Sequence, residues 1–159
     1  MKKLNSNDLK ETAYESPKGK YAMTDKNLSE ELGRDRNSTD VMLRHPFDVE
    51  ICRVPKGKII CPYHSHSAQW EFYHVISGSG QCRDETGFTD IVAGDFFLFK
   101  PGEAHQLIAS ANEDLVLYVV ADNPMGESCH YPDSKKWVVR SPERRLIRSE
   151  PIDYYDGEE

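Results

Sequence analysis

The chain has 159 residues, 38% of them hydrophobic and 30% charged, which is enough for one domain with its own hydrophobic core. It carries 27 acidic and 20 basic residues, and the net charge of −7 argues against nucleic acid as a partner, because phosphate contacts need a basic face. No stretch approaches the ~20 apolar residues that cross a bilayer, and polar residues follow Met1, so we expect a cytoplasmic protein without a membrane partner.

The N-terminal part of the chain has little regular pattern. Residues 1–20 are polar and without periodicity, and we expect them to form an extended arm. Residues 27–33 predict one short helical turn that is closed by Gly33. We therefore expect three parts: an N-terminal arm with this turn over 1–40, a β-barrel over 41–123, and a C-terminal segment over 124–159 that packs on the barrel and has an acidic end.

Strand signals follow one another closely after the arm. They lie at 49–54, 59–66, 71–77, 80–84, 89–92, 95–100, 105–109 and 115–120. Turns rich in Gly, Pro or Asn separate most of them, and no long amphipathic helix interrupts the series. Short strands at this spacing predict an all-β sandwich or barrel. Residues 96–99 are apolar on both faces, so we expect them to form a central strand that is buried on one side by the core and on the other by another sheet or subunit.

The cysteines are widely spaced. Cys52, Cys61, Cys82 and Cys129 form no Cys-x-x-Cys pair, and in a reducing compartment we expect them to be free thiols. Cys61 lies three residues before His64, but we expect a buried thiol there and not a ligand, since its sulfur is softer than the neighbouring ligand types.

Three histidines and one glutamate stand out in two short blocks of the predicted strands. Alternate residues of a strand share a face, so His64 and His66 point the same way. The strand pattern breaks after His66, and beyond the break Glu71 faces one side and His74 the other. His105 lies on a later strand, which a barrel can bring alongside the first block.

These residue types suit a metal ion. Three imidazoles and one carboxylate, from His64, His66, His105 and Glu71, can hold one divalent cation and leave coordination positions open. The alternative is four polar residues on a solvated rim, but the joint spacing favours the metal. Parity places His74 in a packing or interface role instead.

Other residues near these blocks have weaker signals. Gln69, Tyr73 and Gln106 can be hydrogen-bond partners of the ligating imidazoles, or ordinary strand and turn polarity. The segment 125–132 can fold back over the barrel mouth and offer His130 as an extra ligand, although a packing role for this loop is the favoured interpretation.

The two blocks resemble the two motifs of the cupin family. Gly57, His64-Ser65-His66, four residues, Glu71, six residues and Gly78 are similar to the first motif. Gly94, five residues, Lys100-Pro101-Gly102, two residues and His105 are similar to the second. The departures, which are one extra residue after Gly57, Lys100 in place of the usual proline and Ala109 in place of a frequent asparagine, remove no ligand.

The resemblance implies a small single-domain cupin. Its fold would be a double-stranded β-helix, or jelly-roll barrel, with one divalent metal ion in the bowl (Zn, Fe, Mn or Ni), and cupins frequently form dimers. Barrel edges and the long N-terminal arm, which could cover a neighbour's sheet, also favour a homodimer. Nitrogen and oxygen ligands do not select among these metals.

The resemblance and the ligand set leave two functions open. One is a metal-dependent enzyme, isomerase-like or dioxygenase-like, that acts on a small polar metabolite such as a sugar or a keto acid. The other is a non-catalytic binding or regulatory module, which is suggested by the lack of an evident second acid or base. Tyr73 is the nearest candidate for that role, whereas Glu103 lies in a Pro-Gly turn that can face solvent.

Overall fold

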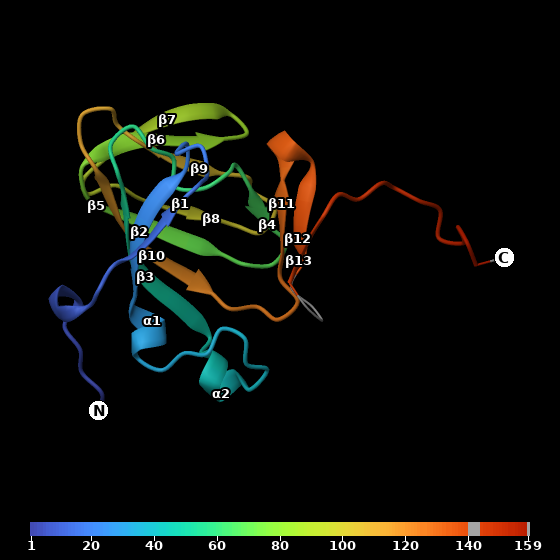
Figure 1. Ribbon diagram of the computed structural model, residues 1–159, viewed down its shortest axis with the longest axis horizontal. Coiled ribbons are helices and arrows are strands. Elements are labelled where there is room, and N and C mark those ends of the chain that lie inside the picture. The colour runs from blue at the N-terminus through green and yellow to red at the C-terminus, as the bar shows by residue number, and fades with distance from the viewer. Residues whose placement is uncertain (140–143, 159) are drawn as a thin grey trace.

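Antiparallel β-sheets make up most of the computed structural model, which describes residues 1–139 and 144–158 (Figure 1). Within these residues the N-terminal elements are the 3₁₀ turn Ser6–Asp8, β1 (Thr12–Glu15), β2 (Ala22–Asn27), α1 (Leu28–Glu31) and α2 (Val41–Arg44). The next strands are β3 (Phe47–Val54), β4 (Ser65–His66), β5 (Glu71–Ser77), β6 (Ser79–Asp84), β7 (Gly87–Val92), β8 (Phe96–Phe99), β9 (Gln106–Ala109) and β10 (Leu115–Asp122). The chain continues with β11 (Ser128–Tyr131), the 3₁₀ turn Pro132–Ser134, β12 (Lys136–Val139) and β13 (Arg145–Ile147).

The strands of the described residues form three sheets. One has six strands in the order β1-β2-β3-β10-β5-β8, one has three in the order β7-β6-β9, and one has four in the order β13-β12-β11-β4. Strands that are distant in sequence are therefore neighbours, such as β3 and β10, which pair over their full length. This order confirms the all-β class, and it brings the two halves of the chain together in one barrel.

The hydrophobic core lies between the six-stranded and the three-stranded sheets. Its fully buried members include Cys52, Val75, Leu107, Leu115 and Leu117, which come from β3, β5, β9 and β10. Burial of these side chains stabilises the barrel by roughly 1.5–3 kcal/mol for each large aliphatic residue. The core fills one end of the barrel and leaves the other end to polar side chains.

The predicted strand positions agree closely with the structure in the middle of the chain. The strand predicted at 71–77 has the same bounds as β5, and the helical turn is confirmed as α1, which is capped by the Asn27 side chain. The strand predicted at 59–66 was too long, because only Ser65–His66 pairs regularly and Ile59 and His64 form isolated bridges. No strand was predicted within 1–40 or after residue 123, yet β1 and β2 extend the chain's own six-stranded sheet and β11 pairs with β4.

The prediction of a central strand at residues 96–99 was wrong, whereas burial of its second face by another subunit stays a prediction. β8 is the last strand of the six-stranded sheet, and its side chains alternate between exposed and partly buried. Phe97 and Phe99 pack against the core, whereas Phe96 and Leu98 are 71% and 46% exposed. A continuous apolar run indicates burial on both sides only when something covers the second face, and in this chain nothing among the described residues does.

Gly78 makes a close connection between β5 and β6. Its φ of 83° is a left-handed conformation that favours glycine, and a Cβ there would lie 1.9 Å from the carbonyl oxygen of Asp114. This tight approach explains why the turn needs a residue without a side chain. Among the described residues, no helix has the length and apolar character needed to cross a membrane.

Candidate metal centre

The two sequence blocks meet through their backbones. His64 and His105 form an antiparallel bridge, in which His64 N donates to His105 O at 3.2 Å and His105 N donates to His64 O at 2.8 Å. Gly102 N also donates to His66 O at 2.8 Å. Residues about forty positions apart are thereby held side by side, so the imidazoles lie in one small volume.

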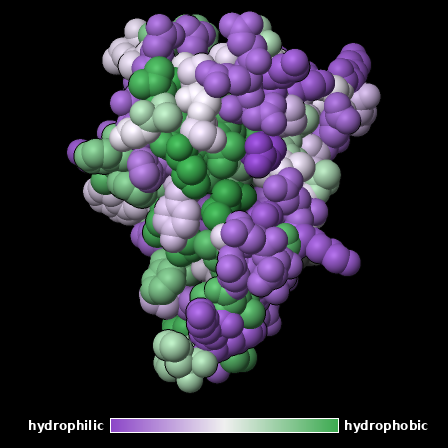
Figure 2. All heavy atoms as spheres, turned by 90° about the vertical axis from the view of Figure 1, so that its left-hand side faces the viewer, coloured by the Kyte–Doolittle hydropathy of each residue, from purple (hydrophilic) through white to green (hydrophobic). Residues whose placement is uncertain are grey.

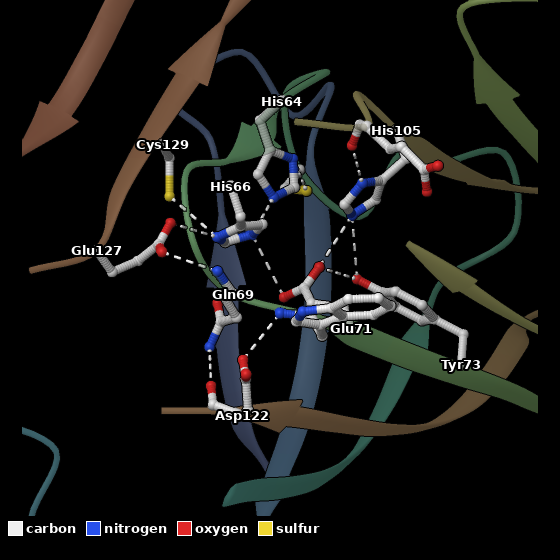
Figure 3. A network of polar contacts seen from close by, with 12 residues as sticks. His64, His66, Gln69, Glu71, Tyr73, His105, Asp122, Glu127 and Cys129 are labelled. Carbon is white, nitrogen blue, oxygen red and sulfur yellow. Dashed lines mark hydrogen bonds and ion pairs between the residues drawn. The ribbon is translucent and has the colours of Figure 1, made fainter. Parts of the chain in front are cut away.

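The donor atoms of the four predicted ligands converge (Figure 3). His64 Nε2 lies 3.1 Å from His66 Nε2, and His66 Nε2 lies 3.4 Å from Glu71 Oε1. His105 Nε2 lies 2.9 Å from Glu71 Oε2. The side chains of His66, Glu71 and His105 are only 7%, 13% and 2% exposed. The structure therefore brings together all four residues that the sequence analysis selected.

The other ring nitrogen of each histidine already has a partner. His64 Nδ1 faces Pro62 O at 3.0 Å, His66 Nδ1 faces Glu127 Oε1 at 3.1 Å, and His105 Nδ1 faces Glu103 O at 3.2 Å. Carbonyl and carboxylate oxygens can only accept, so each Nδ1 carries the proton. The Nε2 atoms of neutral rings are then free to bind a metal, which is the arrangement found where an outer hydrogen bond orients a ligating histidine.

The arrangement requires a cation beside the Nε2 atoms. Two unprotonated nitrogens 3.1 Å apart, with a carboxylate next to them, repel one another. Without a metal a proton takes this place: burial opposes charge on His66, yet hydrogen bonds to Cys129 and Glu127 raise its pKa to about 10. Burial lowers the pKa of neighbouring His64 to about 4. The donor set therefore fits a divalent ion, which would replace that proton.

Glu71 is ionised although it is buried. Burial alone would raise its pKa, but in the metal-free site a protonated Nε2 of His105, 2.9 Å away, and the charge on His66 lower the pKa to about 2. The Tyr73 hydroxyl donates to Glu71 Oε2 at 2.9 Å and lies 3.5 Å from His105 Nε2. Tyr73 thus supports the carboxylate, and burial next to Glu71 raises its own pKa well above the ordinary value.

Glu127 is the supporting residue that the sequence analysis missed. It is 3% exposed, and its carboxylate accepts from the backbone N–H groups of Ser67, Ala68 and Gln69 at 2.9–3.1 Å as well as facing His66. Burial opposes ionisation of Glu127, but the hydrogen bond with His66 lowers its pKa. The carboxylate therefore ties His66 to the turn that follows it and holds Nδ1 in the donor state.

Glu127 lies on a segment whose direction only the tertiary structure reveals. β11 pairs with β4, so Cys129 lies opposite His66 and the face shared by Glu127 and Cys129 points at that histidine. Alternation of Glu127, Cys129 and Tyr131 was the signal that could have indicated this face. His66, Glu127 and Cys129 form a second group of metal-ligand type, but the Glu127 oxygens are already occupied by backbone donors, so the group orients His66 and does not form a second site.

The other histidines and the two glutamines that the sequence analysis considered lie away from the ligating atoms. His74 is exposed on the outer face of β5, in agreement with parity. His130 stacks on Trp137 with ring centroids 4.4 Å apart, so it packs and does not reach the ligands. Gln69 donates to Asp122 O at 2.6 Å and Gln106 donates to Cys61 O at 2.9 Å, so neither contacts a ligating imidazole.

Two aromatic rings pack against the candidate ligands, and a cavity lies beside them. The Phe99 ring lies parallel to the His105 ring at 4.0 Å, and the Tyr131 ring stacks on His64 at 5.9 Å. A cavity of about 250 Å³ opens over the ligands, and Gln69 lies in its wall. Its other polar lining residues are Arg34, Arg36, Asp48 and Glu50, none of which the sequence analysis selected.

Arg34 and Asp48 bring buried, partly unsatisfied groups to this cavity. Arg34 Nη1 pairs with Asp48 Oδ2 at 2.7 Å and Nη2 donates to Asn123 Oδ1 at 2.7 Å. Arg34 Nε and Asp48 Oδ1 are buried without a hydrogen-bond partner among the described residues. These two atoms are buried and do not face the cavity, so the polar character of its wall comes from the other atoms of Arg34 and Asp48 and from Arg36 and Glu50.

Comparison with known proteins agrees with this geometry. A family model for the cupin domain matches residues 50–121, and no curated protein matches the chain. A crystal structure of a sugar phosphate isomerase of the cupin superfamily from Silicibacter pomeroyi is similar with a TM-score of 0.75 at 20% identity, covering 96% of this chain and 98% of that one. A protein from Acidithiobacillus ferrooxidans, provisionally assigned as a sugar phosphate isomerase, has a TM-score of 0.77 at 23% identity, with 92% of each chain covered.

A third similar structure has another name. It is a predicted oxalate decarboxylase from Thermotoga maritima, with a TM-score of 0.62 at 19% identity, covering 77% of this chain and all of that chain (100%). At these identities the similarities establish the fold, a double-stranded β-helix, and the different names of the relatives show that one fold carries more than one activity.

Proposed function

Because the chain belongs to the cupin superfamily, we propose that His64, His66, Glu71 and His105 hold one divalent metal ion, such as Zn, Fe, Mn or Ni. The observation that carries this proposal is the common orientation of the three imidazoles. Each has Nδ1 hydrogen-bonded outward, while Nε2 of His66 and of His105 faces the Glu71 carboxylate and Nε2 of His64 faces Nε2 of His66. Histidines on a solvated rim need not all carry the proton on Nδ1. Histidines that bind one ion through Nε2 must all do so.

We further propose that the chain is a metal-dependent isomerase of a small hydroxy-carbonyl compound of the sugar phosphate type. A bound divalent ion supplies Lewis-acid polarisation of a carbonyl oxygen. The guanidinium groups of Arg34 and Arg36 line the same cavity and suit an anionic substrate. Two structurally similar proteins with sugar phosphate isomerase names support this choice, and no observation favours an oxygenase.

The chain's own residues have distinct parts in this proposal. Glu127 keeps His66 Nδ1 protonated, and Tyr73 donates to Glu71 so that the carboxylate keeps its orientation. The rings of Phe99 and Tyr131 lie against His105 and His64 and limit the access of water to them. Arg34 is held by Asp48 and Asn123, so its charge is preorganised for an anionic group.

The test combines metal analysis with turnover. Natively purified protein should contain about one divalent ion per chain, and it should interconvert an aldose phosphate and a ketose phosphate, followed by NMR. Glu71→Gln and His105→Ala should lose metal and turnover together. His74→Ala is the matched control, because it removes a histidine from the outer face of β5 and should change neither. Unchanged turnover in metal-stripped protein would refute the enzymatic proposal, and full metal content in His105→Ala would refute the ligand assignment.

A homodimer is a separate proposal. The outer face of the six-stranded sheet carries exposed Phe96, Leu98 and Ile76, and Figure 2 shows hydrophobic atoms gathered in a band on the side of the molecule that bears β5 in Figure 1. We propose a second copy of the chain as the occupant, because a flat apolar face next to the edge strand β8 is suited to packing against its own equivalent. Sedimentation at micromolar concentration tests this, and a monomer alone would refute it.

A further inference from the structure

A second carboxylate lines the cavity from a strand two places away in the same sheet. Glu50 on β3 lies opposite Val119 on β10, and Val119 lies opposite Tyr73 on β5. The next row consists of Asp48, Ala121 and Glu71. Side chains in these rows share the inner face, and adjacent strands are about 4.8 Å apart. Glu50 and the metal-ligand Glu71 therefore stand two strands apart across β10.

The residues between the two carboxylates are small enough to leave space. Val119 and Ala121 line the cavity together with Glu50 and Glu71. A molecule in this cavity, over the ligands, would therefore lie between the two glutamates. A group that transfers protons must lie beside the bound substrate and must not itself bind the metal. Glu50 has the required position.

Glu50 is outside the set of metal-ligating atoms. Among the described residues, donor atoms of ligand type lie within 4.8 Å of one another in two groups, His64-His66-Glu71 and His66-Glu127-Cys129, and neither contains Glu50. His105 is also outside both groups, but its Nε2 contacts Glu71 at 2.9 Å, whereas the Glu50 carboxylate accepts its hydrogen bond from a thiol. Nor does the Glu50 carboxylate form an ion pair within the described residues. Its Oε1 accepts one hydrogen bond, from Cys52 Sγ at 3.2 Å.

The two glutamates have opposite electrostatic environments. Burial raises the pKa of Glu50 to about 7, whereas the histidines lower the pKa of Glu71 to about 2 in spite of its burial. The titratable or charged groups that act on Glu50 or are acted on by it are Asp48, Cys52, Asp25, Glu71, Tyr14, Arg36 and Cys61. Two carboxyl groups whose environments separate their pKa values are typical of sites where one group stays ionised and the other exchanges protons.

We propose that Glu50 is the catalytic acid and base of this site and that it moves a proton between adjacent carbons of a hydroxy-carbonyl substrate. This inference rests on the proposed isomerase function. The carboxylate takes the proton from the carbon next to the carbonyl, the C–H electron pair forms a carbon–carbon double bond, and the carbonyl π pair moves onto the carbonyl oxygen, which gains a proton from water. The neighbouring hydroxyl gives its proton to water and becomes the new carbonyl, while the same carboxyl group returns the carbon-bound proton to the former carbonyl carbon. The rearrangement is redox-neutral, so no oxidant or reductant is needed. The alternative of a non-catalytic binding module was suggested by the lack of an evident acid or base, and in this proposal Glu50 supplies that group.

Hydrogen exchange with solvent tests the proposal directly. Metal-loaded protein is incubated in D₂O with fructose 6-phosphate, ribulose 5-phosphate or dihydroxyacetone phosphate, and deuterium next to the carbonyl is measured by NMR. The wild type should incorporate deuterium, and Glu50→Gln should do so more slowly by a factor of about 100 at least. Glu50→Asp should recover part of the rate. Glu85→Gln is the control, because Glu85 is exposed in the turn between β6 and β7.

Metal content separates the outcomes. Glu50→Gln should keep the wild-type amount of metal, and a loss of metal in proportion to the rate would make Glu50 a ligand and overturn the proposal. A wild-type rate in Glu50→Gln would overturn the proposal and leave the isomerase function intact. Metal-loaded wild type that neither exchanges deuterium with any of the three probes nor interconverts any of them with its isomer would refute the isomerase function and, with it, the role of Glu50.

A variant of Cys52 adds a readout that does not depend on a complete loss. The Cys52 thiol donates to Glu50, and this hydrogen bond favours the ionised carboxylate. The rate of deuterium exchange should rise with pH as Glu50 ionises. Cys52→Ala should therefore shift this part of the pH profile toward higher pH, with the metal content unchanged. No shift of this part of the profile in Cys52→Ala would contradict its assignment to Glu50.

Discussion

The two faces of β5 differ in a way that reverses the usual pattern of a half-buried strand. The inward residues include Glu71 and Tyr73, which are buried in a network of charged and polar groups. The outward residues include Phe72 and Ile76, and Ile76 is 46% exposed. Polar side chains are buried only when they have partners, and apolar ones are exposed at a cost. The inner face therefore carries the groups of the proposed metal site, and the outer face carries the apolar side chains of the proposed dimer interface.

The same difference appears along the inner face itself. Val75 on β5 and Leu117 on β10 fill the core at one end of the barrel, whereas Glu71 and Ala121 face the cavity at the other. A strand of seven residues thus serves as hydrophobic support at one end and as part of the metal centre at the other. The core holds the strands in register, and the register determines where the donor atoms meet.

The largest expected effect comes from removing the inward carboxylate. Glu71→Gln should weaken metal binding by more than the ~10–100-fold that is usual for residues that only orient a ligand. The reason is that the charge opposite three neutral imidazoles is lost. Isothermal titration with Zn²⁺ measures the change. Outward His74→Ala should bind the ion like the wild type, and equal weakening in both variants would contradict the difference between the two faces.

Removing the support behind His66 should have a smaller effect. Glu127→Ala leaves His66 Nδ1 without its acceptor and frees the turn at 67–69, so Zn²⁺ affinity should fall by about 10–100-fold. Glu127→Gln keeps an acceptor oxygen and should recover part of the loss. Metal affinity equal to that of the wild type in Glu127→Ala would show that His66 needs no such support.

The pH dependence of stability separates the two buried glutamates. The folded pKa of Glu50, about 7, lies above its ordinary value of 4.5, so its contribution to stability is complete below about pH 4.5 and is lost as the pH rises to about 7. The loss is up to about 3 kcal/mol. Urea unfolding of metal-free protein should show that Glu50→Gln lacks this decline and Glu85→Gln retains it. A decline of the same size in Glu50→Gln would contradict the assignment.

The smallest effect on the folded chain is expected on the outer face. Phe96→Ser and Leu98→Ser remove exposed side chains of β8, so the stability of the monomer should change by about 0.5 kcal/mol or less. Zn²⁺ affinity should stay the same. Sedimentation should show weaker self-association, and a dimer as strong as that of the wild type would show that this face is not the interface.

Much of the fold was predictable because the strand signal is local. Alternation and turn residues identified β3 and the strands from β5 to β10, and α1 followed from Asn27 and Gly33. β1, β2, β11, β12 and β13 were missed. β1, β2 and β11 are largely polar, and the partners of β2 and β11 are distant in sequence. The central position expected for residues 96–99 was wrong, because sequence periodicity does not state whether a strand lies in the middle of a sheet or at its edge.

Residue type and strand parity, both of which are local properties, were enough to select His64, His66, Glu71 and His105 as candidate ligands. The residues that surround them followed from the fold alone. Glu127 reaches His66 because β11 pairs with β4, and Glu50 lines the same cavity as Glu71 because β10 lies between β3 and β5. Such neighbours depend on strand order, and strand order depends on packing over the whole barrel.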